Sequence, residues 1–125
     1  MKQLNRKEYE SLLKTFVAAA THDKPLLVLG QAGLGKKGAI KKLFEFMYDE
    51  FDEVNLDDEQ QFTVPGWVNE KHPLAMVDYR KMDVGEQEMA YVQYLQANLG
   101  KAIVVLAENG RIAEVPEWCE VIELV

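Results

Sequence analysis

Cysteine is almost absent from this 125-residue chain. The single Cys119 cannot form an internal disulfide, which excludes a disulfide-stapled fold and favours a reducing compartment. It has no obvious basic neighbour in the sequence, so we expect a packing residue and not a nucleophile. Histidine is nearly as scarce. His22 and His72 lie in polar segments with no second His or Cys at ligand spacing, which argues against a zinc site.

Long hydrophobic runs are also missing. The longest strongly apolar stretch, residues 102–107, is far too short to cross a bilayer, and the N-terminus is polar. We therefore expect a cytoplasmic protein with no membrane partner. Basic charge is in deficit as well, with 14 Lys and Arg against 21 Asp and Glu and a net charge of −7. Direct nucleic-acid binding is not expected, because neutralising phosphates requires clustered basic side chains.

The remaining composition is that of an ordinary globular domain, with 48% hydrophobic and 28% charged residues. A chain of this length is predicted to form one domain, residues 1–125. Acidic charge is concentrated locally, with seven carboxylates in residues 49–59. We interpret that segment as a solvated loop and helix end; a docking surface for a basic partner is the alternative.

Short apolar runs alternate with helical patterns along the chain. Asn5 and Glu8 predict a capping box at the start of a helix whose apolar residues continue to Ala20. Further helices are predicted over residues 40–51 and from a second capping signal, Asp83 with Glu86, to Gly100. Strands are predicted at residues 26–29, 54–56, 62–64, 74–77, 102–107 and 121–125. Strands separated by helices need crossover connections, so we predict a three-layer α/β/α domain with a mostly parallel sheet.

Residues 30–37, G-Q-A-G-L-G-K-K, follow one of these strands and precede a helical pattern. They fit the phosphate-binding P-loop, G-x-x-x-x-G-K-[ST], at every position except the last. The backbone N–H groups of such a loop cradle phosphate oxygens, and its lysine neutralises the β and γ phosphates. A glycine-rich turn that binds nothing is the alternative. The predicted nucleotide-binding residues are Gly30, Gly33, Leu34, Gly35, Lys36 and Lys37.

Lys37 stands where a Ser or Thr hydroxyl normally coordinates Mg²⁺. An ammonium group has no lone pair to offer a metal, although it places positive charge near the metal's position. The expected cofactor is therefore ATP or ADP bound with little or no help from Mg²⁺. If the chain is an enzyme, it is an ATP hydrolase, and the loss of the hydroxyl predicts weak or no activity.

Three further segments, residues 62–64, 73–80 and 105–108, accompany the P-loop pattern in a familiar order. Together they resemble the TsaE-type ATPase subunit of the bacterial machinery that makes threonylcarbamoyladenosine on tRNA. That family carries Ser-Pro-Thr-Phe-Thr after the first P-loop helix, then strands ending in Asp-x-Tyr-Arg and in Ile-Glu-Trp. The resemblance implies a P-loop fold, ATP binding and a protein partner. It also implies a catalytic and metal-side role for Asp78, and a catalytic role for Glu108, which would face the active site.

This chain departs from the family pattern where the chemistry should be. Lys37 replaces the threonine, residues 59–61 read Glu-Gln-Gln in place of Ser-Pro-Thr, Asp78 is followed directly by Tyr79, and Asn109 replaces the tryptophan. Fold and partner binding are thus expected to carry over better than catalysis. Asp78 is alternatively a strand-end carboxylate that caps the next turn, and Glu108 a surface-loop residue.

Two functional hypotheses stay open. The first is a degenerate, TsaE-like P-loop protein that binds nucleotide with weak or absent hydrolysis, within a tRNA-modification or other multi-subunit assembly. The second is a pseudo-NTPase that serves only as a protein-interaction module. A weaker resemblance to a truncated AAA+ core rests on residues 107–109, as the end of a sensor strand, and on residues 115–124, as a last core strand. The arginine finger expected near that last strand is missing.

Replacing Lys37 by Thr is expected to strengthen the Mg²⁺ dependence of nucleotide binding, because the hydroxyl restores a metal ligand. Calorimetric titration of ATP with Mg²⁺ and with EDTA measures the change. Lys42→Thr removes the same charge outside the loop and serves as the control. An unchanged metal response in Lys37→Thr contradicts the role given to this position.

Overall fold

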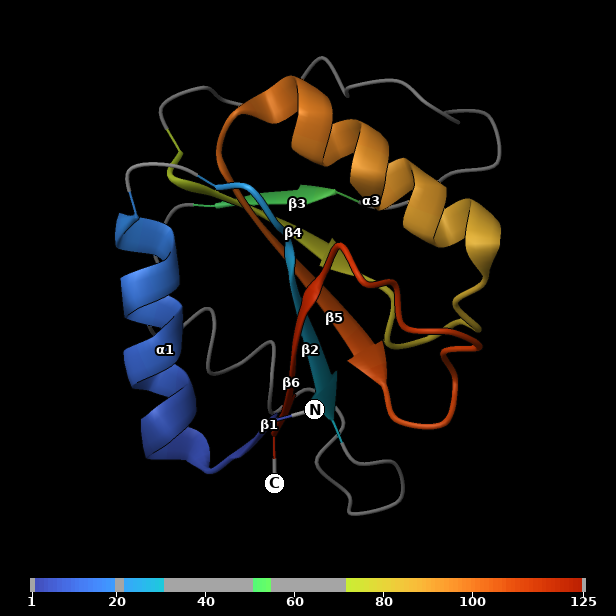
Figure 1. Cartoon of the computed structure of the whole chain (residues 1–125), viewed down its shortest axis with the longest axis horizontal. Helices are drawn as coiled ribbons and strands as arrows, with labels where there is room; N and C mark the ends of the chain where they lie inside the picture. Colours follow the sequence, from blue (N-terminus) through green and yellow to red (C-terminus); the bar gives the residue numbers. More distant parts are fainter. Residues whose placement is uncertain (1, 20–21, 31–50, 55–71, 125) are drawn as a thin grey trace.

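The computed structural model describes residues 2–19, 22–30, 51–54 and 72–124. In this part of the chain, six strands form one all-parallel sheet in the order β1-β6-β2-β5-β4-β3 (Figure 1). Neither of the two described helices has the length and apolar character to cross a membrane. The elements are β1 Lys2–Leu4, α1 Arg6–Ala18, β2 Leu26–Gly30, β3 Asp52–Val54, β4 Leu74–Asp78, α3 Glu86–Leu99, β5 Ala102–Glu108 and β6 Glu120–Leu124.

The described helices cover opposite faces of the sheet, so the α/β fold predicted from the sequence is confirmed. Leu26 and Val28 face α1 and pack in one core with Tyr9. Leu27 and Leu29 face the other way and belong to the core under α3. Because consecutive residues of a strand point to opposite faces, a strand covered on both sides must be apolar at every position. This is why β2 and β5 show no polar alternation.

The start of α1 follows the sequence prediction. The Asn5 side chain accepts a hydrogen bond from the Glu8 N–H at 2.9 Å, and the Glu8 side chain accepts one from the Asn5 N–H at 3.3 Å. This capping box satisfies donors that the first helical turn leaves unpaired. Tyr9 and Leu13 are buried, whereas Ala20 lies outside the described residues. Three apolar residues of α1 are partly buried against the same core: Leu12, Phe16 and Val17.

The capping signal predicted for α3 is wrong. The residue before the helix is Gly85, and no side-chain hydrogen bond caps it. Asp83 lies too far upstream because the chain is still extended at Val84, which forms a parallel bridge with Ile112. The other end of α3 is confirmed, since Gly100 terminates it in the left-handed conformation at φ 63°.

Two further strands differ from the prediction. β1 was not predicted, because three residues, Lys-Gln-Leu, are too few to give a periodic signal. It forms by pairing alongside β6, with Leu4 opposite Leu124. β3 begins at Asp52, two residues earlier than predicted, and Phe51 precedes it outside any helix. The rest of the helix predicted over residues 40–51, the strand at 62–64 and residues 55–56 lie outside the described residues.

A buried polar cluster joins the amino ends of β3, β4 and β5. The Asp52 carboxylate lies 3.0 Å from the Nζ of Lys101 and 3.0 Å from the Nδ1 of His72. Asp52 is only 4% exposed and Lys101 9%. The interpretation of the acidic segment as solvated is therefore wrong for Asp52, whose charge is paired inside the protein. A buried charge persists only when it is paired and hydrogen-bonded.

Replacing Asp52 by Asn is expected to lower the free energy of unfolding by about 3 kcal/mol, because it removes a carboxylate partner from a buried ammonium group. Chemical denaturation measures the loss. Glu114→Gln, an exposed carboxylate without an ion pair in the described part of the chain, is the control and should change stability by less than about 0.5 kcal/mol. Equal effects in the two variants would contradict a stabilising cluster.

Candidate functional site

Three of the predicted site residues lie at one edge of the sheet. Gly30, Asp78 and Glu108 are the last residues of β2, β4 and β5, which are neighbours in the order β2-β5-β4. Because the strands are parallel, their carboxyl ends share this edge. Gly30 lies opposite Glu108 in the register, and Asp78 lies opposite Leu106. The other predicted nucleotide-binding residues lie outside the described part of the chain: Gly33, Leu34, Gly35, Lys36 and Lys37.

The strand order reverses between β2 and β5. The strand that follows β2 in the chain, β3, lies beyond β5 and β4 on one side, whereas the strand that follows β5, β6, lies on the other side of β2. Such a topological switch point is where open parallel sheets generally bind ligands, outside the carboxyl ends of the strands. The Asn109 N–H donates to the Gly30 carbonyl at 2.7 Å and holds the two strand ends together.

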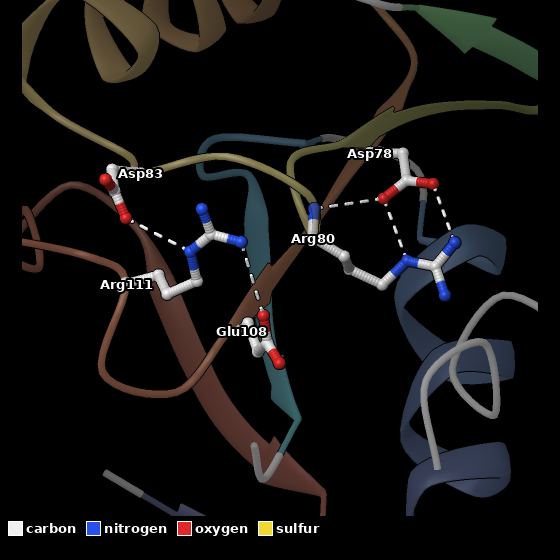
Figure 2. Close-up of polar contacts among 5 residues, drawn as sticks. All are labelled: Asp78, Arg80, Asp83, Glu108 and Arg111. Carbon is white, nitrogen blue, oxygen red and sulfur yellow. Dashed lines mark hydrogen bonds and ion pairs between the residues drawn. The ribbon is translucent and has the colours of Figure 1, made fainter. Parts of the chain in front are cut away.

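Asp78 is engaged by the turn that follows it. Its Oδ1 accepts from the Nε of Arg80 at 2.8 Å, and its Oδ2 accepts from the Nη2 at 2.8 Å (Figure 2). The Arg80 backbone N–H also donates to Oδ1, at 3.1 Å. The carboxylate is 12% exposed and the guanidinium side chain 17%. The turn-capping contact considered for Asp78 is thus present, together with a two-point ion pair that compensates its charge.

Glu108 lies in a second ion-pair cluster at the same edge. The Arg111 Nη1 is 3.6 Å from the Glu108 Oε2, and the Arg111 Nε donates to the Asp83 Oδ1 at 3.1 Å (Figure 2). The hydrogen bond to Asp83 raises the pKa of the Arg111 guanidinium. Glu108 is 15% exposed and ends β5, so the alternative that it is a surface-loop residue is wrong.

Local spacing in the sequence indicates some of these contacts and not others. Arg80 follows Asp78 by two residues, the spacing at which an Asp side chain accepts from the backbone of its own turn, and this could have predicted the contact. Arg111 follows Glu108 by three residues and was not singled out. Its partner Asp83 is 28 residues away, and no local pattern links the two.

Two further residues with reactive or titratable side chains, Cys119 and Tyr79, are buried in the core. Cys119 is 7% exposed within the core under α3, and burial raises the pKa of its thiol to about 12. Its place in this core confirms the predicted packing role, and a protonated thiol is a poor nucleophile. Tyr79 is fully buried, its hydroxyl donates to the Glu88 carbonyl at 3.1 Å, and burial raises its pKa. No cluster of three or more His, Cys, Asp or Glu side chains suited to a metal ion occurs among the described residues.

Comparison with known proteins gives no match, whether with family models, with curated proteins or with solved structures. The resemblances to TsaE-type ATPases and to AAA+ cores are not tested by this result and stay predictions.

Replacing Arg80 by Gln is expected to lower the free energy of unfolding by about 1–2 kcal/mol, because a partly buried carboxylate loses two charge-assisted hydrogen bonds. Lys81→Gln removes the same charge from the next, exposed position and should be nearly neutral. Urea denaturation measures the free energy of unfolding of both variants. If the two variants lose equal stability, the ion pair contributes nothing beyond general surface charge.

Proposed function

We propose that this chain is a degenerate P-loop protein that binds ATP or ADP at the carboxyl edge of its sheet and hydrolyses it weakly or not at all. The position of Gly30 carries the proposal. This glycine begins the G-Q-A-G-L-G-K-K segment, ends a buried central strand and lies at the topological switch point beside Glu108. A glycine-rich turn at such a strand end is the setting in which backbone amides bind phosphate.

The ion pairs at this edge support weak dependence on Mg²⁺. Both oxygens of Asp78 accept hydrogen bonds from Arg80, so a metal ion would have to displace the guanidinium group. Glu108 has a looser partner: its Oε2 lies 3.6 Å from the Nη1 of Arg111, whose Nε donates to Asp83. Magnesium needs carboxylate oxygens with little competition, because it gives up its water ligands reluctantly. Lys36 and Lys37 instead offer phosphate a positive charge without a metal.

The setting that we propose follows from the TsaE resemblance and the acidic composition. The protein acts in the cytoplasm with a protein partner, within a tRNA-modification assembly or another multi-subunit complex, and does not contact nucleic acid directly. The second candidate is an interaction module that binds no nucleotide. The paired state of Asp78 and Glu108 favours this candidate too, because carboxylates already compensated within the chain need no ligand to be stable.

Calorimetric titration of the full chain with ATP and with ADP, each in Mg²⁺ and in EDTA, tests the proposal. We expect binding that changes little between the two buffers. Lys36→Ala is expected to weaken it at least tenfold, because a charged phosphate contact contributes about 1.5–3 kcal/mol. Lys14→Ala, on the exposed side of α1, is the control. No heat of binding at millimolar nucleotide would overturn the proposal and leave the interaction module.

A further inference from the structure

A groove of about 640 Å³ lies between the first half of α3 and the loop that joins β5 to β6. Its apolar lining comes from Met89 and Ala90 of the helix and from Ala113, Pro116 and Trp118 of the loop. Val115, next to it in the chain, is 37% exposed. This is more than any other large hydrophobic side chain among residues 2–19, 22–30, 51–54 and 72–124. The groove therefore presents apolar surface to solvent beside α3, the helix whose position over the sheet is seen in Figure 1.

The charged side chains that line this groove in the described part of the chain have one sign. Glu86 of α3 and Glu114 and Glu117 of the loop line it, and no basic residue does so in the part of the chain that the structure describes. All three side chains are exposed, and none of them makes an ion pair there. Other carboxylates of the same region are paired, as Asp83 is with Arg111. The unpaired rim therefore gives the groove a negative potential complementary to a basic ligand.

The walls of the groove are fixed to each other by backbone contacts. The Val84 N–H donates to the Arg111 carbonyl at 2.7 Å, and the Ala113 N–H donates to the Val84 carbonyl at 3.1 Å. These bonds hold the loop against the chain that enters α3. A ligand entering a pre-formed groove orders little of the protein, and this lowers the free-energy cost of binding.

From this apolar lining, acidic rim and fixed backbone, we infer that the groove docks a basic segment of a partner protein. One apolar side chain of the segment lies against Ala90, Pro116 and Trp118, and lysines or arginines on either side of it pair with the rim carboxylates. Trp118 adds an aromatic side chain, a type enriched at the energetic centres of interfaces. This inference names a surface and the chemistry of its occupant, and it does not depend on nucleotide binding.

The test uses the full chain and a short synthetic peptide with a central leucine between paired lysines. Two matched peptides carry glutamates for the lysines or serine for the leucine. Backbone amide shifts in NMR spectra report the binding site. We expect saturable shifts at residues 86–93, 113–115, 117 and 118 with the lysine–leucine peptide, weaker shifts with the serine peptide and none with the glutamate peptide. Higher salt should weaken the binding, because the rim charges are exposed.

Variants of the groove complete the experiment. Glu114→Lys with Glu117→Lys should weaken peptide binding roughly tenfold, because two attractions become repulsions. Ala90→Gln should weaken it by filling the groove without changing charge. Glu10→Lys with Asp23→Lys makes the same charge change on the α1 side and should stay within about twofold of the unmodified chain. Each of these positions is at least partly exposed, and the amide spectrum checks that the variants fold.

Three outcomes would overturn the inference. The first is the absence of saturable shifts at the groove amides at millimolar peptide. The second is equal weakening by the groove variant and by the α1-side control, which would reduce the effect to net charge. The third is a shift of the same amides when the chain alone is concentrated, because a second copy would then be the occupant.

Discussion

The structure depends on one constraint: a parallel sheet must be covered on both faces, and each return of the chain must cross over one of them. The strands in the middle of the sheet therefore have room only for apolar side chains, as in β2 and β5. In β2, β4 and β5, the polar side chains lie at or beyond the strand ends, as Asp78 and Glu108 do. Because all strands run the same way, these ends form two edges of different chemistry.

The two edges handle charge differently. At the amino edge, Asp52 and Lys101 are almost completely buried and pair across 3.0 Å, so this edge is committed to holding strands together. At the carboxyl edge, Asp78 and Glu108 keep partial contact with solvent and pair with arginines from the loops that follow their strands. Breaking the ion pair of a partly hydrated charge costs little free energy, so a bound ligand can replace the partner. Breaking a fully buried pair costs several kcal/mol and is not compensated in this way. Ligand binding is therefore expected at the carboxyl edge and not at the amino edge.

The sequence predicted what is encoded locally and missed what depends on distant contacts. The strands β2 and β5 were predicted from their uniform apolar runs, and the start of α1 from the capping box at Asn5. Each of these signals is a pattern within a few residues. The cap assigned to Asp83 was wrong because the Val84–Ile112 bridge keeps the chain extended there. The pairing of Asp52 with Lys101 spans 49 residues and leaves no periodic trace. At the candidate site, the strand-end positions of Asp78 and Glu108 could be predicted, but the arginine that joins Glu108 to Asp83 could not.

The bridge between Val84 and Ile112 also joins the segment ahead of α3 to the loop between β5 and β6. Arg111 sits beside this bridge, with one nitrogen on Glu108 at the end of β5 and another on Asp83 ahead of α3. This guanidinium therefore joins the end of β5 to the segment ahead of α3 through two ion pairs, in addition to the backbone bridge. If a molecule at the strand ends and one beside α3 are coupled through this link, each alters the affinity of the other by the same factor.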